Sequence, residues 1–254
     1  MSRRHNGLWA RLARKIADLR STESVYDEDG LRSFHNHDFI CDPEFQRAYK
    51  RGMQAAGKDF HWRWRVHVGL WAAQCAMKLS GDFVECGVGH GFMSSAIVTQ
   101  LDWDATGRTF YLLDSFAGID ERYVSSEERA AGIMDRNALH IEMGLYSLDE
   151  ASVRANFSEW KNVKLIAGSI PSTLSEIDAQ KIAYLHIDLN NSPPEVAALQ
   201  FLWERLVPGA FVLLDDYAGL GYNSQKIGVD SFAGPRGVAV LSLPTGQGLI
   251  IKPA

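Results

Sequence analysis

Cysteine is scarce in this sequence. The three cysteines among 254 residues are odd in number and lack the spacing of a metal-binding motif: Cys41, Cys75 and Cys86. They fit a reducing compartment with free, buried thiols. Long apolar runs are also missing, since none approaches the roughly 20 residues needed to cross a bilayer. We therefore expect a cytoplasmic globular protein that is not an integral membrane protein.

An excess of positive charge is missing too. The formal net charge is -5, whereas a nucleic-acid-binding domain normally presents a basic face, so we expect no nucleic-acid partner. The first 20 residues are the exception. They carry six Lys or Arg against a single acid, and their apolar residues fall on one stripe of a helix: Leu8, Trp9, Leu12, Ile16 and Leu19. A membrane-surface helix or a transit peptide fits this stripe, but we favour a helix that packs on its own domain or on a neighbouring subunit.

A glycine is absent where a dinucleotide-binding fingerprint requires one. The segment Asp82-Phe-Val-Glu-Cys-Gly-Val-Gly-His-Gly91 reads as a buried strand and a glycine-rich turn that opens a helix. In the fingerprint G-x-G-x-x-G the third glycine would fall at position 92, which is Phe92. Glu85 precedes the turn and would repel a pyrophosphate, but it suits a cationic amino acid or a sulfonium. The glycines alternate instead, at Gly87, Gly89 and Gly91.

A second predicted strand ends in the acid Asp114. A carboxylate at this point can accept hydrogen bonds from ribose hydroxyls. The pattern E-x-G-x-G-x-G, followed by an acid 23 residues after Gly91, resembles the class I S-adenosylmethionine-dependent methyltransferases. We expect Glu85 and the three glycines to face the methionine part of that cofactor and Asp114 to face its ribose.

Beyond residue 82 the chain alternates between predicted strands and helices. The strands are 83–87, 109–114, 163–167, 182–188, 209–215, 237–242 and 247–252, and the helices are 91–101, 148–159, 194–206 and 223–232. This alternation predicts an α/β fold with a Rossmann-like, doubly wound and mostly parallel sheet. The last two strands are separated by a short connection, so the C-terminal strand should close a hairpin and run antiparallel.

Two further parts complete the predicted organisation. Residues 1–57 form an N-terminal helical extension, in which 21–57 is a linker with short helices, and the methyltransferase domain covers 58–254 and opens with a helix over 60–79. Between Asp114 and the strand at 163 lies a long, charged segment. Long connections of this kind are often lids or binding loops, so we expect a lid at about 119–160.

Acidic residues follow two later strands. Asp188 ends one of them, and Asp215 and Asp216 end the next. Ligands bind outside the carboxyl ends of parallel strands, so these acids should share one rim with the glycine turn. Three carboxylates together repel one another, and a divalent cation with oxygen ligands relieves that repulsion. The alternative is that the acids cap a helix or form a turn; we favour a Mg²⁺ site.

These acids sharpen the resemblance. Together with the strand that starts at Val84, the segment Leu113-Asp-Ser-Phe-Ala-Gly118 and Asp215-Asp-Tyr217, they resemble the macrocin O-methyltransferase (TylF-like) family over about residues 60–254. The resemblance implies Mg²⁺-dependent methyl transfer to a hydroxyl, typically on a sugar of a natural product, by a homo-oligomer. It also implies that Ser115, Phe116 and the Gly168-Ser169 turn flank the adenine. The chain departs from the pattern at Asn190 and Asn191, where that family tends to have an acid and a tyrosine.

The predicted chemistry is an in-line methyl transfer. Alignment of the acceptor oxygen with the sulfonium methyl supplies much of the catalysis. Asp188 is the first candidate for the base that removes the hydroxyl proton. His186 points to the same side of a regular strand as Asp188, so it is either the base or a partner of the metal ligands. His90, in the glycine turn, lies close to the expected cofactor or simply starts the helix.

Three other interpretations stay open. A nicotinamide-dependent oxidoreductase would use a similar sheet, but Phe92 and the acidic rim argue against it. A non-catalytic S-adenosylmethionine-binding protein would keep the fold, although the presence of all three acids argues against loss of activity. A metal-dependent hydrolase would leave Glu85 and Asp114 unexplained.

Overall fold

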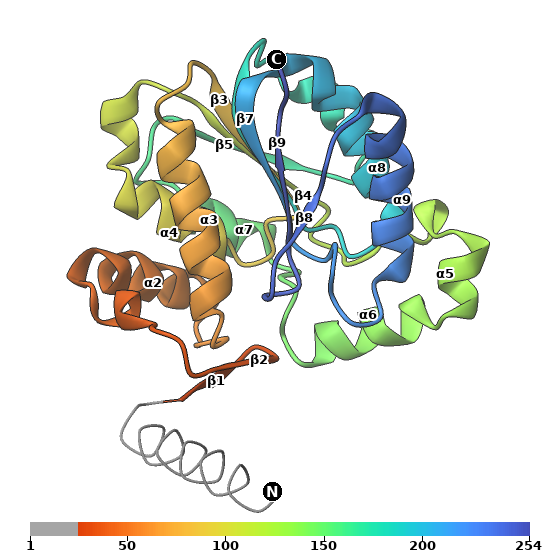
Figure 1. Cartoon of the computed structure of the whole chain (residues 1–254), viewed down its shortest axis with the longest axis horizontal. Coiled ribbons are helices and arrows are strands. Elements are labelled where there is room, and N and C mark those ends of the chain that lie inside the picture. The colour runs from red at the N-terminus through yellow and green to blue at the C-terminus, as the bar shows by residue number, and fades with distance from the viewer. Residues whose placement is uncertain (1–24) are drawn as a thin grey trace, which may run out of the picture.

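The computed structural model describes residues 25–254 (Figure 1). The predicted helix over Leu8–Leu19 lies outside these residues. The described part begins with a two-stranded antiparallel hairpin, β1 (Tyr26–Glu28) and β2 (Leu31–Ser33). None of the helices between residues 25 and 254 is long and apolar enough to cross a membrane.

A seven-stranded sheet in the order β5-β4-β3-β6-β7-β9-β8 forms the centre of the molecule. The first five strands in this order pair in parallel, and β9 pairs antiparallel with both of its neighbours, which confirms the predicted mostly parallel sheet with an antiparallel C-terminal strand. The strands are β3 (Asp82–Cys86), β4 (Phe110–Asp114), β5 (Val163–Ala167), β6 (Ile182–Ile187), β7 (Leu206–Leu214), β8 (Leu241–Ser242) and β9 (Gly248–Ile251).

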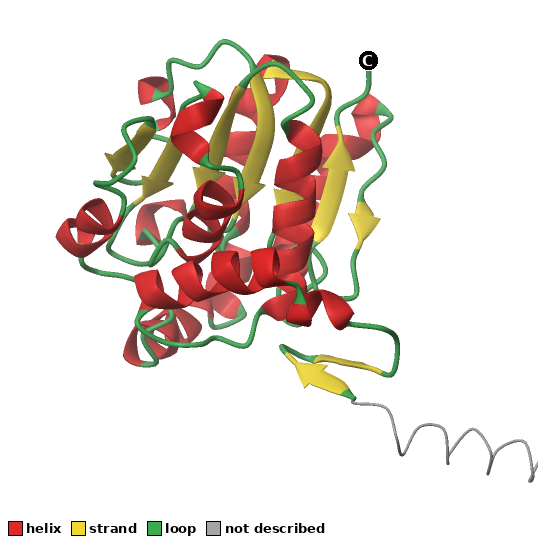
Figure 2. Ribbon diagram, turned by 90° about the vertical axis from the view of Figure 1, so that its left-hand side faces the viewer, coloured by secondary structure: helices red, strands yellow, loops and turns green. Residues whose placement is uncertain are grey.

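Helices cover both faces of the sheet (Figures 1 and 2). One buried apolar cluster joins one face to α2, α3, α4 and α7, and a second joins the other face to α8 and α9. Alternation along each strand sends neighbouring side chains to opposite clusters, as with Phe83 and Val84. The helices are α2 (Pro43–Ala56), α3 (Arg63–Ala76), α4 (Phe92–Gln100), α5 (Ser126–Ala130), α6 (Ile133–Glu142), α7 (Glu150–Asn156), α8 (Ser192–Leu202) and α9 (Asn223–Ala233).

The segment before α3 is more regular than predicted. Where a linker with short helices was expected, residues 43–56 form one helix, α2, which packs against α4. The Asp42 side chain caps its N-terminus by accepting hydrogen bonds from two backbone N–H groups, with Oδ1 2.7 Å from Glu44 N and 3.3 Å from Phe45 N. Pro43 occupies the first turn, and Gly57 ends the helix in the left-handed conformation. All three of these helix-end signals are present in the sequence.

Two other predicted elements are shorter than expected. The helix predicted over 60–79 covers only Arg63–Ala76: His61 has a positive φ of 60° just before it, and beyond Ala76 the hydrogen bonds tighten, with the Leu79 N–H donating to the Ala76 carbonyl three residues back at 3.0 Å. The strand predicted over 237–242 is reduced to Leu241–Ser242: Gly237 still belongs to the end of a short 3-10 turn, and only Leu241 and Ser242 pair with β9.

The long connection after β4 folds into α5, α6 and α7. Helix α7 returns to the apolar core through Val153 and the adjacent Phe157. Helices α5 and α6 instead lie at the edge where the parallel strands end, below the sheet in the view of Figure 1.

Candidate active site

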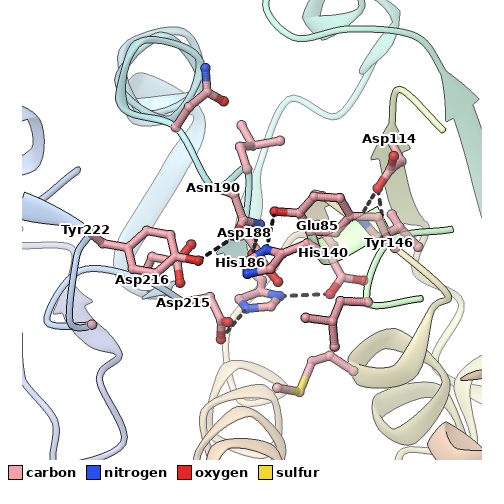
Figure 3. Close-up of a pocket in the computed structure, with 18 of the residues that line it drawn as sticks. Glu85, Asp114, His140, Tyr146, His186, Asp188, Asn190, Asp215, Asp216 and Tyr222 are labelled. Carbon is pink, nitrogen blue, oxygen red and sulfur yellow. Dashed lines mark hydrogen bonds and ion pairs between the residues drawn. The ribbon is translucent and has the colours of Figure 1, made fainter. Parts of the chain in front are cut away.

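A cavity of about 690 Å³ opens at the carboxyl ends of the parallel strands. The glycine turn, the ends of β4, β6 and β7, the α6 segment and the turn between β1 and β2 all contribute to its wall. Figure 3 shows side chains from β3, from the ends of β4, β6 and β7, and from α6 and the loop that follows it, pointing toward one another. The predicted site residues that line it are Glu85, Gly87, Gly89, Asp114, Ser115, Gly168, Ser169, His186, Asp188, Asp215 and Asp216.

Two residues predicted to contact the cofactor do not line this cavity. Gly91 precedes α4 with a φ of 80°, and a Cβ there would lie 2.6 Å from the Phe157 ring. Phe116 is buried in the apolar core, and its backbone N–H donates to Asp114 Oδ1 at 2.8 Å. Both residues therefore shape the loops behind the cavity.

The glycine turn meets the end of β6 at the backbone level. Gly87 has a φ of 92°, and a Cβ on it would lie 1.8 Å from the carbonyl oxygen of Asp188. The Asp188 N–H also donates to the Cys86 carbonyl at 2.8 Å. Only glycine permits this approach, so the predicted cofactor loop and the first predicted metal ligand are in direct contact.

Asp114 holds the glycine turn in place. Its Oδ2 accepts hydrogen bonds from the N–H groups of Val88 and Gly89, both at 2.8 Å. Burial raises the pKa of this carboxyl, and the three backbone N–H donors oppose the rise. A carboxylate has about four acceptor sites, so Asp114 retains acceptor capacity toward a ligand in the cavity.

Glu85 and His186 form a buried pair beneath the cavity. His186 Nδ1 lies 2.8 Å from Glu85 Oε1, and His186 Nε2 lies 3.6 Å from Asp215 Oδ1. Figure 3 shows the imidazole ring between the two carboxylates. Burial alone would lower the pKa of His186, but the flanking carboxylates outweigh it and raise the pKa to about 10. The arrangement favours an imidazolium at neutral pH.

The three predicted metal ligands converge. Carboxylate oxygens of Asp188, Asp215 and Asp216 all lie within 4.8 Å of one another. Burial and the neighbouring acids raise the pKa of Asp188 well above its usual range and that of Asp216 to about 7. Burial opposes ionisation of Asp215 as well, yet Arg65 and His186 hold its pKa far below the usual range.

Arg65 is the main residue of the site that sequence reasoning missed. Its Nη1 donates to Asp215 Oδ2 at 2.7 Å and to the Asp215 carbonyl at 2.9 Å, and its Nη2 donates to the Thr245 carbonyl at 3.1 Å. Nothing in the sequence Trp62-Arg-Trp-Arg65 indicated a partner 150 positions away.

Aromatic side chains that the sequence did not single out complete the wall. Tyr222 Oη donates to Asn190 Oδ1 at 3.1 Å, and Asn190 Nδ2 donates to Asp188 Oδ1 at 2.9 Å. His140 lies in α6 and Tyr146 in the loop that follows it, and His140 Nδ1 lies 2.9 Å from Tyr146 Oη. Both pairs line the cavity, so it presents several hydroxyl and amide groups beside the acids.

The sequence of the chain matches known proteins over part of its length. Over 147 residues it is 33% identical to 8-demethyl-8-(2,3-dimethoxy-alpha-L-rhamnosyl)-tetracenomycin-C 4'-O-methyltransferase of Streptomyces olivaceus, covering 54% of this chain and 53% of that protein. Over 152 residues it is 25% identical to mycinamicin III 3''-O-methyltransferase of Micromonospora griseorubida, covering 54% and 55%. The chain thus spans about half the length of the curated relatives it matches.

Solved structures match the fold over most of the chain. The O-methyltransferase NovP superposes with a TM-score of 0.67 at 18% identity, covering 86% of this chain and 100% of that one. The calicheamicin methyltransferase CalS11 gives a TM-score of 0.61 at 15% identity, with coverages of 82% and 93%. These likenesses show the methyltransferase Rossmann-like fold. The family model of macrocin-O-methyltransferase (TylF) matches residues 71–239, and the chain therefore belongs to that family.

Proposed function

We propose that this protein transfers a methyl group from S-adenosylmethionine to a hydroxyl of a small molecule, namely a sugar or a glycosylated natural product. Family membership supports methyl transfer, and the names of both curated relatives describe O-methylation of natural products. The observation that carries the proposal is the contact of Gly87 with Asp188, which puts the glycine turn and the acidic cluster in one cavity. An oxidoreductase gains no support from the family match.

The cofactor would lie along the ends of β3, β4 and β5. Glu85, Gly87 and Gly89 would face its methionine part, and Asp114 would accept a hydrogen bond from the ribose. Ser115 and the Gly168–Ser169 turn would flank the adenine, with Gly91 and Phe116 supporting these loops from behind. The support for this orientation is that Glu85, Gly87, Gly89, Asp114, Ser115, Gly168 and Ser169 all line the same cavity.

The acidic cluster fits a magnesium ion. Its donors are all carboxylate oxygens, which Mg²⁺ prefers, and Asp216 Oδ2 is buried without a hydrogen-bond partner among residues 25–254. Arg65 already compensates Asp215, so Asp188 and Asp216 carry the charge that a cation would balance. A bound Mg²⁺ would lower the pKa of the acceptor hydroxyl and orient it.

The chain's own residues would align and deprotonate the acceptor. Asp188 is the candidate base: as the methyl leaves the sulfonium for the acceptor oxygen, the hydroxyl proton passes to its carboxylate. His186 has both ring nitrogens turned toward carboxylates, so it acts as a partner that positions Glu85 and Asp215 and not as the base. Segments α5 and α6 cover the strand ends and would exclude water from the transfer.

Two further proposals concern the organisation of the chain. Helices α5 and α6 support a lid at about 119–160. We also propose a division between an extension at 1–57 and a domain at 58–254, which the unfolding of a variant in α2 tests. A homo-oligomer is proposed on the family resemblance alone.

Calorimetric titration with S-adenosylhomocysteine tests the cofactor, with NAD as the control ligand. We expect micromolar binding of the homocysteine compound and none of NAD. Asp114→Ala should abolish binding, and Asp114→Asn, which keeps the shape but loses an acceptor oxygen, should weaken it. Binding of NAD instead would refute the proposed function. Binding without methyl transfer to any hydroxylated acceptor would favour a non-catalytic protein.

A further inference from the structure

The turn between β1 and β2 forms part of the cavity wall. Its two central residues, Asp29 and Gly30, line the cavity and have φ angles of 51° and 72°. An Asp-Gly pair with two positive φ angles is typical of a two-residue hairpin turn, in which Asp tolerates the left-handed conformation. This turn lies outside residues 71–239, which match the family, so family membership assigns it no role.

Arg65 fixes this turn beside the acidic cluster. Its Nε donates to Asp29 Oδ2 at 3.0 Å, while its Nη1 donates to Asp215 Oδ2 at 2.7 Å. One planar guanidinium therefore joins Asp29 to a proposed metal ligand and sets their separation. The next residue back, Glu28, is held by Arg63 Nη1, which lies 2.8 Å from each of its carboxylate oxygens. The turn is thus anchored at two consecutive residues, Glu28 and Asp29.

The Asp29 carboxylate uses only one oxygen in these contacts. Oδ2 accepts from Arg65, whereas Oδ1 has no hydrogen-bond partner among residues 25–254. The Asp29 side chain is 18% exposed and lies in the cavity wall, where a ligand can reach it. An ionised carboxylate only accepts hydrogen bonds, so the group it can bind there is a hydroxyl or another N–H or O–H donor.

We propose that Asp29 is an acceptor-binding residue: it receives a hydrogen bond from a second hydroxyl of the acceptor, next to the one that is methylated. The inference rests on the proposed function and deepens it. The acceptor is then a vicinal diol or a larger polyol, bound at one hydroxyl by the acidic cluster and at the neighbouring hydroxyl by Asp29. Arg65 keeps Asp29 and the acidic cluster at a fixed spacing. Specificity for the pair of hydroxyls therefore comes from the turn between β1 and β2, outside the residues that match the family.

Two substitutions separate this role from a structural one. Asp29→Gly removes the carboxylate and keeps the left-handed turn, since glycine adopts positive φ readily. Asp29→Asn keeps the shape and removes the charge. Asp27→Asn is the matched control, because Asp27 lies on the same hairpin, its side chain is 66% exposed, and it forms an ion pair with the equally exposed Arg32 at 3.6 Å.

The experiment is calorimetry on protein saturated with S-adenosylhomocysteine and Mg²⁺. The probes are methyl α-L-rhamnopyranoside and a panel of other methyl hexopyranosides, each with its monodeoxy analogues. We expect Asp29→Gly to weaken binding of the parent sugar by roughly 10- to 100-fold, as for loss of a hydrogen bond to a charged group. The deoxy analogue that lacks the contacted hydroxyl should bind the wild type and Asp29→Gly equally. The affinity of Asp29→Asn for the parent sugar should fall between those of the wild type and Asp29→Gly, and the affinity of Asp27→Asn should match that of the wild type.

Three results would overturn the inference. They are unchanged affinity of Asp29→Gly for every parent sugar, an equal loss for parent and deoxy compounds, and no sugar binding by wild-type protein that does bind S-adenosylhomocysteine. Failure of the wild type to bind S-adenosylhomocysteine would instead remove the proposed function itself, so the two failures are told apart in the first titration.

Discussion

At the scale of single residues, Asp216 is an acid whose charge the described part of the chain leaves poorly compensated. Its pKa is raised to about 7 by burial and by Asp215, against about 3.9 in an unfolded chain. Between these values the folded protein holds a proton that the unfolded chain releases, so stability falls as pH rises toward and through 7. Removing the charge should therefore help the metal-free protein most at high pH.

We predict that Asp216→Asn raises the free energy of unfolding at pH 8 in EDTA, relative to the wild type, and that the gain shrinks toward pH 5. Urea denaturation at the two pH values measures this. Asp135→Asn, at an exposed position on α6, is the control. A gain of the same size at both pH values would contradict the argument.

Asp216 should also determine whether a divalent cation stabilises the protein. A ligand that binds only the folded state stabilises it by about 2.7 kcal/mol at a concentration 100 times its Kd. Mg²⁺ or Mn²⁺ should therefore raise the midpoint of thermal unfolding of the wild type and leave Asp216→Asn almost unmoved. Ca²⁺-free buffer with EDTA gives the baseline. Equal shifts in both proteins would show that the cation binds elsewhere.

The alternating glycines differ in what they do. A Cβ on Gly91 would lie 2.6 Å from the Phe157 ring, whereas for a Cβ on Gly89 the nearest atom among residues 25–254 is the Leu145 carbonyl oxygen, at 3.9 Å. Both have positive φ, which costs other residues about 1–2 kcal/mol. Gly91→Ala should add about 1–3 kcal/mol of overpacking to that loss. Gly89→Ala should lower the free energy of unfolding less, as measured by denaturant unfolding. It should instead weaken the binding of S-adenosylhomocysteine, since Gly89 lines the cavity. The reverse order of stabilities would refute the assignment.

At the scale of elements, the α5 segment is tied to the start of α8. Glu128 is 3% exposed; its Oε1 accepts from the Ser192 N–H at 2.6 Å, and its Oε2 accepts from the Ser125 N–H at 3.0 Å. One buried carboxylate therefore caps two helices. Asn191 Nδ2 adds a hydrogen bond to the Tyr123 carbonyl at 3.3 Å, so the proposed lid is fastened just beyond Asp188.

Glu128→Ala should release this fastening at a cost of about 1.5–3 kcal/mol, the usual range for hydrogen bonds to a charged group. Amide hydrogen exchange in α5 and α6 should then speed up by roughly tenfold or more, while β3 keeps its protection. Glu127→Ala is the control, because the side chain of that exposed neighbour accepts a hydrogen bond from the adjacent Ser126 Oγ, at 3.0 Å, and so does not join α5 to α8. Uniform loss of protection throughout the sheet would mean that Glu128 supports the whole fold.

The order of elements could be predicted from the sequence because each strand is a short apolar run between turn signals. The strands of the sheet other than β8 were located to within about three residues, and the antiparallel end followed from a short connection. The ends of elements were predicted less well. Gly237 and His61 adopt left-handed backbone conformations next to a strand and a helix that are shorter than predicted. The capping residues of α2 did not lead to a predicted helix.

At the scale of the whole molecule, α2 belongs to the same apolar cluster as α3 and α4. A Cβ on Gly52 would lie 2.5 Å from the Phe92 ring, so α2 approaches α4 closely. Alanine normally favours a helix over glycine by about 1 kcal/mol. We predict the opposite sign here: Gly52→Ala should lower the free energy of unfolding by about 1–3 kcal/mol.

The measurement is denaturant unfolding followed by circular dichroism and by tryptophan fluorescence. A single coincident transition, shifted as a whole, would show that α2 unfolds with the sheet and would argue against a boundary at residue 57. Two transitions would support that boundary. Lys50→Ala, at an exposed position on the same helix, should leave stability unchanged within about 0.5 kcal/mol.

The candidate site was only partly predictable, for a physical reason. Strand ends in a parallel sheet share one rim, so Glu85, Asp114, Asp188 and Asp215 could be grouped from their positions in the strands. Arg65 and Asp29 come from a helix and a hairpin whose placement depends on tertiary packing. Their mutual contacts, and the hydrogen bond of Arg65 to Asp215, have no periodic signature in the sequence.

The contact of Gly87 with the Asp188 carbonyl has a consequence for how such an enzyme can diverge. The two segments touch through main-chain atoms on adjacent strands, so the spacing between methyl donor and acceptor oxygen would be built into the sheet and not into side-chain rotamers. Substitutions in the hairpin turn and in the α5–α6 segment could then exchange one acceptor for another without retuning that spacing. Related enzymes would then acquire new substrates through substitutions in these surrounding segments, while the geometry of the methyl transfer is kept.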